Sequence, residues 1–304
     1  MKALILAAGY ATRLYPLTKE YPKPLLKVGK RPIINYIIDK LAALDDIDEI
    51  IVVTNSKFFP KFKKWRSHLQ SKKHISLVDD LTKSHSDRRG AIGDMSFVID
   101  KKRLKDDLLI IGGDNLFSGD LKEFLSFVKG NPNPAIGAYN IKDIRQAKKY
   151  GVIKLGAKFK LIDFKEKPEN PKSTLIAMCL YYFPKEKLRL IKEYLMGRES
   201  IRPFLNKFRK VYPFWIRPFP IPLRKSPKVT AEGNFLDIKT DKPRPFYYTG
   251  SLRSKKERGK HDATGFYIDW LRKKVPVYGF VFDGFWYDIG DHKFYNEAKQ
   301  KFSR

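Results

Sequence analysis

The sequence predicts an α/β protein built around a doubly wound, mostly parallel mixed sheet. Short apolar runs alternate with stretches of helical spacing through the first 200 residues, which is typical of buried strands joined by helices. A loop of small residues and a glycine-aspartate pair each follow directly after such a run, at what would be the carboxyl edge of the sheet. The 304 residues, 42% of them apolar, are enough to form a large core.

The first half of the chain is expected to alternate strands and helices. The first predicted strand, Ala3–Ala7, is wholly apolar, which is typical of a strand buried on both faces. Helical spacing, with a proline near the first helical position, predicts a helix at 32–41. A basic amphipathic helix is expected at 58–69 and a polar loop at 79–89. Further apolar runs predict strands at 49–53, 75–78 and 107–111.

From Pro134 onward the pattern becomes rich in strands. Strands are expected at 135–139, 151–155, 160–164 and 175–183. A helix is expected at 185–195. After residue 260, the pattern predicts a helix at 263–273, a strand at 275–280 and a last helix at 292–302. The chain has no internal repeat.

Composition excludes several classes of protein. The single cysteine, Cys179, excludes a disulfide framework and a cysteine-rich zinc site. No window approaches 18 uncharged apolar residues, so no transmembrane helix is expected. The apolar start of the chain resembles a signal peptide, but the run has only six residues and soon reaches Arg13, which favours a buried strand. A reduced, cytoplasmic protein is therefore expected.

Positive charge is the most unusual feature of the composition. The chain has 62 lysines and arginines against 33 acids, a net charge of +29, which favours phosphate-bearing partners such as nucleotides, nucleic acid or an anionic surface. Residues 201–260 alone have 16 lysines and arginines, 4 acids, 8 of the 19 prolines and ten aromatic residues. We expect an irregular insertion with at most one short hairpin, because Pro218, Pro220 and Pro222 interrupt helices and inner strands.

The sequence thus divides into a domain of residues 1–200 and 261–304 and the insertion 201–260. Three interpretations of the insertion compete. In the first it is tolerated, since lengthening a loop from about 5 to about 60 residues costs only about 2 kcal/mol of closure entropy. In the second it is a basic, aromatic arm that binds nucleic acid or an anionic membrane face. In the third it is foreign sequence that impairs the domain. Nucleic acid is expected to bind only through this segment.

The strongest chemical signal lies near the N-terminus. The first strand runs into Ala7-Ala8-Gly9, and Arg13 and Lys23 follow at short range. Small residues at the end of a strand let backbone N–H groups approach a phosphate closely. The spacings of the Walker A and dinucleotide-binding motifs are absent. We therefore expect a phosphate cradle of another kind, the alternative being a surface loop with solvated cations.

Two aspartates are candidate ligands of Mg²⁺. Asp114 follows the buried strand at 107–111, where a carboxylate can hold a metal ion together with substrate phosphate oxygens. Asp288 lies between bulky apolar residues and could supply the second carboxylate. The alternatives are a turn or helix cap for Asp114 and the cap of the last helix for Asp288. Asp291 fits that last role better, because the helix is expected to begin directly after it.

A second cationic site is expected at Lys167, which stands between a predicted strand and Pro168. It could bind a phosphate as a point charge, the alternative being a solvated run of charges. Together the motifs supply a phosphate cradle, two metal-binding carboxylates and a second site for phosphate. That set suits phosphoryl or nucleotidyl transfer, which depends on positioning and charge neutralisation and needs no nucleophilic triad.

Five motifs, in order, make the chain resemble the sugar-phosphate nucleotidyltransferases, or nucleotide-sugar pyrophosphorylases, and among them enzymes of the glucose-1-phosphate thymidylyltransferase type. The motifs are the glycine-rich signature from Gly9 to Pro24, Gly113-Asp114-Asn115, Tyr150-Gly151-Val152, Glu166-Lys167-Pro168 and the late segment from Trp286 to Gly290. The likeness covers residues 1–200 and 261–304. It implies the Rossmann-like fold of nucleotide-diphospho-sugar transferases.

The resemblance implies an Mg²⁺-dependent reaction in which a sugar 1-phosphate attacks the α-phosphorus of a nucleoside triphosphate and pyrophosphate leaves. Arg13 would then stabilise the pyrophosphate, Lys23 would neutralise charge around the reacting phosphates, and Lys167 would bind the sugar phosphate. Asp114 and Asp288 would hold Mg²⁺. Glu166 would orient sugar hydroxyls and Gly90 would lie against the base. The substrate-binding residues carried over in this way are Ala8, Gly9, Gly90, Asn115, Tyr150, Gly151 and Glu166.

Three features depart from the family pattern. Ala11 replaces the second glycine of the signature, where a positive φ would be strained. No glutamine that could recognise the base stands at 82–89. Cys179 stands where the family has glycine near the sugar, so a side chain there could narrow the sugar pocket.

The favoured function is transfer of a thymidylyl or uridylyl group to glucose 1-phosphate. One alternative is transfer of a cytidylyl or guanylyl group to another phosphorylated acceptor such as phosphocholine. The other is a catalytically weak relative that acts as a regulatory or nucleic-acid-binding subunit. The retained charged residues argue against a loss of catalysis, whereas the basic insertion favours the binding role. Family members often assemble, so a homo-oligomer is also expected.

Overall fold

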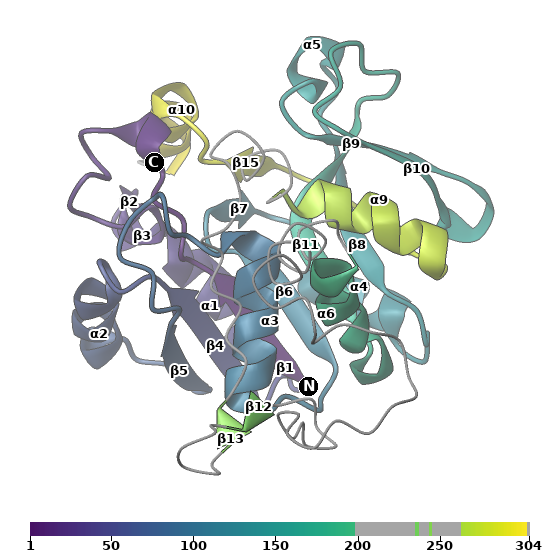
Figure 1. Ribbon diagram of the computed structural model, residues 1–304. Coiled ribbons are helices and arrows are strands. Elements are labelled where there is room, and N and C mark those ends of the chain that lie inside the picture. Colours follow the sequence, from purple (N-terminus) through teal and green to yellow (C-terminus); the bar gives the residue numbers. More distant parts are fainter. Residues whose placement is uncertain (198–234, 237–242, 245–262, 303–304) are drawn as a thin grey trace, which may run out of the picture. The chain divides into compact units, whose positions relative to one another are not determined.

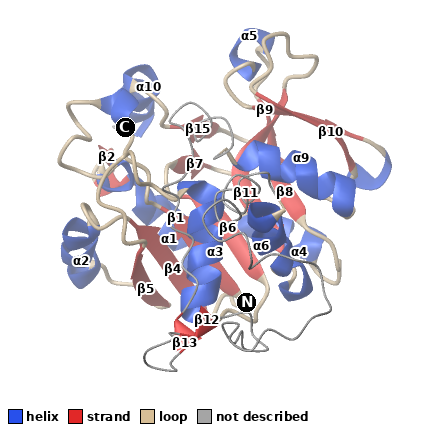
Figure 2. Ribbon diagram, viewed as in Figure 1, coloured by secondary structure: helices blue, strands red, loops and turns tan. Residues whose placement is uncertain are grey.

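The computed structural model describes residues 1–197, 235–236, 243–244 and 263–302. Contacts divide the chain into two units, one of Met1–Leu195 with Lys255–Arg304 and one of Met196–Ser254. The described part of the first unit contains a nine-stranded sheet (Figures 1 and 2). Its strands are β1 (Lys2–Leu6), β4 (Glu49–Thr54), β5 (His74–Asp79), β6 (Leu108–Gly112), β8 (Ala135–Asn140), β9 (Gly151–Leu155), β10 (Leu161–Glu166), β11 (Leu175–Phe183) and β14 (Tyr278–Phe282).

The sheet is mixed, as predicted. Its strand order is β10-β9-β11-β6-β1-β4-β5, and β8 pairs with both β11 and β14. Strands β6, β1, β4 and β5 are parallel neighbours, and so are β8 and β14. Strand β11 runs antiparallel to β6, β8 and β9, and β9 runs antiparallel to β10. The parallel strands therefore all end at one edge, where Leu6 lies opposite both Val53 and Gly112.

Helices cover both faces of the sheet, because its central strands are apolar on both sides. Ile5 belongs to the core beneath α1 (Ile33–Ala42), α2 (Phe59–His68) and α4 (Leu121–Val128). Leu4, its neighbour, belongs to the core on the opposite face, beneath α3 (Gly90–Lys102), α6 (Arg189–Met196) and α9 (Thr264–Lys274). Figure 2 shows these last three helices in front of the strands. The shorter α5 (Ile144–Ala147) adds Ala147 to the same core as Ile5, whereas the last helix, α10 (His292–Phe302), packs in a separate smaller cluster through Tyr295 and Ala298.

Most predicted elements are found, with ends within two residues of those expected. Two expectations were wrong in detail. The strand expected at 275–280 begins three residues later as β14, and the helix expected at 185–195 is a 3₁₀ turn, Lys185–Lys187, followed by α6. Helices α3, α4 and α5 were not predicted. Neither were two short antiparallel ribbons, β2 (Lys27–Val28) with β3 (Arg31–Pro32) and β7 (Asn115–Phe117) with β15 (Trp286–Asp288).

The predicted insertion, 201–260, lies outside the described residues except for one short antiparallel pair. This pair is β12 (Phe235–Leu236) with β13 (Pro243–Arg244). The three interpretations of the insertion therefore stay predictions. No helix among the described residues has both the length and the apolar character needed to cross a membrane.

The carboxyl ends of β1 and β6 are held close together. The backbone N–H of Gly113 donates to the carbonyl of Leu6 over 2.8 Å. A Cβ at Gly113 would lie 2.9 Å from that same carbonyl oxygen, so only glycine allows this approach. The loop after β1 and the turn that carries Asp114 are thereby placed side by side.

Candidate active site

A cavity of about 220 Å³ gathers most of the predicted site residues. They come from the loop after β1, the β6–β7 turn, the start of β9, the end of β10, and β15. Several of these segments are far apart in the sequence, so the fold and not local sequence brings them together. The predicted residues that line the cavity are Arg13, Asp114, Asn115, Tyr150, Gly151, Glu166, Lys167 and Asp288.

The two predicted metal-binding carboxylates lie close enough to influence each other. Strand β15 pairs with β7 so that Asp288 is opposite Asn115, the residue after Asp114. Burial, and then the negative charge of Asp114, raise the pKa of Asp288 to about 6 against the opposing effect of Lys23. Asp291 caps α10 instead, since its Oδ1 accepts from the N–H of Phe294 at 3.1 Å. The expectation that Asp291 rather than Asp288 caps the last helix is confirmed.

Lys23 contacts Asp114 but does not line the cavity. Its ammonium forms an ion pair with Asp114 and donates to the carbonyl of Ile289 over 2.6 Å. Burial alone would lower the pKa of Lys23, but the charges of Asp114 and Asp288 outweigh it, so the pKa is raised and the ammonium stays charged. Lys23 therefore connects the β6–β7 turn to the segment after β15.

Asn115 is buried and uses its amide entirely within the protein. Its Nδ2 donates to the carbonyl oxygens of Met178 (2.8 Å) and Cys179 (3.1 Å), and its Oδ1 accepts from the indole N–H of Trp286 at 3.1 Å. This one side chain thus connects β7, β11 and β15. Although Asn115 lines the cavity, its geometry is that of a positioning residue.

The cavity lining also contains a neighbouring acid and cation, Glu166 and Lys167. Glu166 is mostly buried, and burial raises the pKa of its carboxyl group. Its Oε1 lies 3.6 Å from the ammonium of Lys167, which is more exposed. A Cβ at Gly265 would overlap the Glu166 carboxylate, so that carboxylate packs directly against the backbone of α9. Glu166 is a fixed acceptor here, and Lys167 a cation that an incoming anion can reach.

Ala8, Gly9 and Gly90 do not line this cavity. Ala8 and Gly9 follow β1, and the carbonyl of Ala8 accepts from Nδ2 of Asn55 at 2.9 Å. Gly90 is the first residue of α3, after the loop that follows β5, and has φ 76°. All three follow the carboxyl ends of parallel strands, so they lie at the edge of the sheet at which the sequence placed them. The structure does not bring them into one cavity with the carboxylates.

The cavity also contains residues that sequence reasoning missed. Lys149 adds a third cation to Arg13 and Lys167. The hydroxyl of Tyr181 donates to Oγ1 of Thr264 over 2.7 Å, which joins β11 to the start of α9. Lys149 directly precedes the Tyr150-Gly151 motif, a signal that could have identified it. Thr264 adjoins the insertion and is not part of any recognised motif.

Cys179 lines the cavity with an unreactive thiol. It has φ 47°, in a part of β11 where the pairing with β8 shifts register. Burial, followed by the charge of Asp114, raises the pKa of the thiol to about 12, so it stays neutral. The Cys179 side chain therefore lies in the wall of the cavity, as expected, and affects the shape of the cavity rather than its chemistry.

Ala11 adopts the left-handed conformation that its place in the signature loop requires. It has φ 45° and ψ 45° and precedes the 3₁₀ turn Thr12–Leu14. Its carbonyl accepts from Oγ1 of Thr18 (2.7 Å) and from the N–H of Leu14 (2.9 Å). These two hydrogen bonds hold a conformation that is unfavourable for any residue with a Cβ.

Ala11→Gly should therefore stabilise the protein. Relief of left-handed strain exceeds the added backbone entropy of glycine, which gives a net gain of about 0.5–1 kcal/mol in the free energy of unfolding by urea. Ala43→Gly is the matched control, because Ala43 is exposed with φ −80°, so glycine relieves no strain there and the added backbone entropy should make that variant slightly less stable. Loss of stability in both variants would contradict the strain at Ala11.

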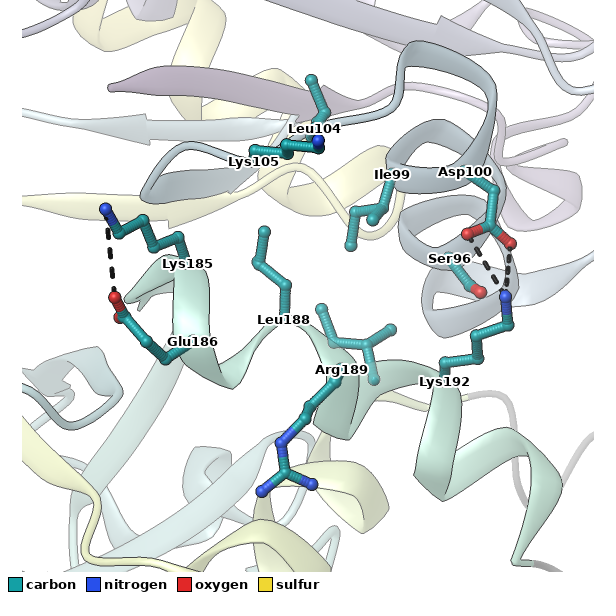
Figure 3. Close-up of a pocket in the computed structure, with 11 residues that line it drawn as sticks. Ser96, Ile99, Asp100, Leu104, Lys105, Lys185, Glu186, Leu188, Arg189 and Lys192 are labelled. Atoms are coloured by element: carbon teal, nitrogen blue, oxygen red, sulfur yellow. Dashed lines mark hydrogen bonds and ion pairs between the residues drawn. The ribbon is translucent and has the colours of Figure 1, made fainter. Parts of the chain in front are cut away.

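A second cavity, of about 430 Å³, lies elsewhere in the same unit (Figure 3). Lys105 on its wall precedes β6 and Lys185 follows β11, so it lies at the opposite edge of the sheet. Lys185 and Lys192 are ion-paired with Glu186 and Asp100, at 4.0 and 3.3 Å. None of the predicted site residues lines it, and the smaller cavity is the candidate active site.

Fold and cavity together define an α/β protein that gathers Asp114 and Asp288 with three cations where phosphorylated ligands bind in such sheets. Residues 2–212 match the nucleotidyl transferase family, and the chain belongs to that family. It is 33% identical over 209 residues to the bifunctional protein GlmU of Methanocaldococcus jannaschii, a match covering 69% of this chain and 46% of that protein. It is 29% identical over 199 residues to a glucose-1-phosphate thymidylyltransferase of Neisseria meningitidis, covering 64% and 65%.

The same fold is also found among solved protein structures. A crystal structure of a UDP-glucose pyrophosphorylase with UDP-glucose superposes with a TM-score of 0.64 at 17% identity, covering 99% of this chain and 97% of that one. The expected nucleotide-diphospho-sugar transferase fold is confirmed. The chain spans about half the length of the first curated relatives that it matches.

Proposed function

We propose that the protein transfers a nucleotidyl group from a nucleoside triphosphate to a sugar 1-phosphate, giving a nucleoside diphosphate sugar and pyrophosphate. The observation that carries this is one cavity lined by the interacting carboxylates Asp114 and Asp288 together with Arg13, Lys149 and Lys167. Charge of both signs is what a reaction between two phosphorylated substrates requires.

The proposed reaction is an in-line displacement between the two substrates. An oxygen of the sugar phosphate forms a bond to the α-phosphorus as the bond to the β-phosphate oxygen breaks, and that electron pair leaves with pyrophosphate. Lys167 and Lys149 hold the sugar phosphate, and Arg13 compensates the charge of the departing pyrophosphate. Glu166 accepts hydrogen bonds from the sugar hydroxyls. No side chain forms a covalent bond, in agreement with the unreactive Cys179 thiol.

Asp114 and Asp288 suit Mg²⁺, which prefers one or two carboxylates together with phosphate oxygens. Among the described residues, no group of three or more acidic, histidine or cysteine side chains could hold a metal ion unaided. We propose that the substrate's own phosphates complete the site. When bound, the ion would neutralise phosphate charge, while Lys23 keeps Asp114 in place through its ion pair.

For the substrates, we propose glucose 1-phosphate with dTTP or UTP. Support comes from the names of the similar proteins, a glucose-1-phosphate thymidylyltransferase and a UDP-glucose pyrophosphorylase. The test is release of pyrophosphate with Mg²⁺ from dTTP, UTP, CTP, GTP or ATP, each with a panel of sugar 1-phosphates and phosphocholine. A preference for glucose 1-phosphate with dTTP or UTP is expected. Preference for phosphocholine, or no release from folded protein, would contradict the proposal.

Lys167→Gln should weaken binding of the sugar phosphate selectively. Its exposed ammonium is 3.6 Å from the mostly buried Glu166 and faces the acceptor end of the cavity. Loss of one charge-assisted contact predicts a KM for the sugar 1-phosphate about 10-fold higher or more, with little change in the KM for the nucleotide. Lys165→Gln, an exposed neighbour outside the cavity, is the control. Equal rises in both KM values would refute this placement.

A further inference from the structure

Much of the positive charge outside the insertion is concentrated in one short segment. Without residues 201–260 the chain has a net charge of +17, and residues 57–73 carry +7 of it, with seven lysines and arginines and no acid. The proposed active site uses none of them. These residues are Lys57, Lys61, Lys63, Lys64, Arg66, Lys72 and Lys73.

Helix α2 carries four of these seven cations, Lys61, Lys63, Lys64 and Arg66, while Lys57 precedes the helix and Lys72 and Lys73 follow it. The apolar side of the helix is committed to the core through Phe62, which is 0% exposed, and through Phe58 directly before the helix, which is 1% exposed. The indole N–H of Trp65 donates to Oδ1 of Asn35 over 2.8 Å, and Nε of Arg66 donates to the carbonyl of Ile75 in β5 over 3.2 Å. Strand β5 is the last in the sheet order, and α2 lies beside it at that end (Figure 1). Helix α2 is thus rigidly held, and its outer face is free to meet a partner.

The charge on this outer face is not compensated. Lys57 is ion-paired with Glu20 at 3.2 Å. Lys61, Lys63 and Lys64 are exposed, and no carboxylate of the described part of the chain lies within 4.0 Å of their ammonium groups. Like charges at helical spacing destabilise a helix by a few tenths of a kcal/mol per pair. Packing therefore gives no reason for this concentration, whereas a polyanionic partner would.

We propose that the outer face of α2 binds the phosphate backbone of a nucleic acid without reading its sequence. Lysine ammonium groups contact phosphates as point charges, and a nucleic acid offers phosphates in a regular row. A helix that binds a membrane surface inserts its apolar face into lipid. The apolar face of α2 is buried in the protein, so this mode is closed to it. The binding is separate from the proposed active site.

The test is the salt dependence of binding to a fluorescent single-stranded oligouridylate, followed by anisotropy with the full chain. The variant combines Lys61→Gln, Lys63→Gln and Lys64→Gln. Binding at low salt should weaken at least about 10-fold, and the slope of log K against log salt should become shallower by about 2, since each lost phosphate contact removes about 0.7. Saturating dTTP or UTP should not displace the RNA, because the two sites are distinct.

The control variant combines Lys122→Gln, Lys129→Gln and Lys154→Gln, which removes the same charge from exposed positions on other elements. It should keep the parental slope. Equal weakening in both variants, or in neither, would overturn the proposal and place any RNA binding elsewhere in the chain. Binding to vesicles of anionic phospholipid but not to RNA would also overturn it. Unchanged thermal unfolding of both variants establishes that the fold is intact.

Discussion

Asp114→Asn should reduce the rate of pyrophosphate release by at least about 10²–10³-fold, the scale on which a charge-stabilising group contributes to such reactions. The substitution keeps the shape of the side chain but removes one of the two carboxylates proposed to hold Mg²⁺. Stability should change little. The lost ion pair with Lys23 is offset by relief of repulsion from Asp288, which still holds the Lys23 charge.

Two further measurements make the Asp114 prediction specific. In Asp114→Asn, the binding of Mn²⁺ in the presence of nucleotide, measured by electron paramagnetic resonance, should weaken along with the rate of pyrophosphate release. Asp283→Asn removes an exposed acid from the loop just before β15, outside the cavity, and should change neither quantity. A near-normal rate for Asp114→Asn, or a large loss of stability with normal metal binding, would show that this carboxylate is not a metal ligand.

The sequence predicts the parallel half of the sheet well because its strands are buried on both faces. Ile5 and Leu4 face opposite cores, so the central residues of β1 are apolar, and the same holds for the centres of β4 and β6. Local motifs also located the carboxyl edge of the sheet, since a strand that ends in a polar loop is visible in the sequence. Asp114 was placed correctly for that reason.

Helix α3 was missed because its sequence lacks a clear apolar stripe. Gly90 and Gly93 weaken its helical propensity, and the buried Asp94 interrupts the apolar face. The ribbon that aligns Asp288 with Asn115 was missed for another reason, since its strands are about 170 residues apart and only three residues long. Pairing over that separation leaves no local pattern. Lys23 illustrates the same limit, because its contact with Ile289 depends on this ribbon.

Asn115→Asp should destabilise the protein by roughly 3 kcal/mol at pH 8, the largest loss expected for a single isosteric change here. The amide nitrogen lies 2.8 and 3.1 Å from two carbonyl oxygens, and a carboxylate oxygen in its place would face both without a proton to donate. The hydrogen bond from the Trp286 indole would survive, so the loss falls on the contact between β7 and β11.

The penalty at Asn115 should depend on pH in a defined direction. Burial beside two carbonyl oxygens raises the folded-state pKa of the new carboxyl group above its unfolded value of about 4. Below the unfolded pKa the group is protonated and can donate one hydrogen bond, so the variant is then closest to the parent. The loss of stability of Asn115→Asp relative to the parent grows as the pH rises through the folded-state pKa of the new carboxyl group. Urea unfolding of both proteins at pH 5 and pH 8 measures this difference.

Asn140→Asp is the matched control for this prediction. Asn140 is exposed, and its Oδ1 accepts from the N–H of Lys142 at 3.0 Å, an interaction that a carboxylate keeps. Its stability should change by less than about 0.5 kcal/mol, with no increase in the deficit at higher pH. If Asn115→Asp behaved in the same way, the amide would not be what holds β11 against β7. The alignment of Asp288 with Asp114 would then depend on the pairing of β15 with β7 and on Lys23.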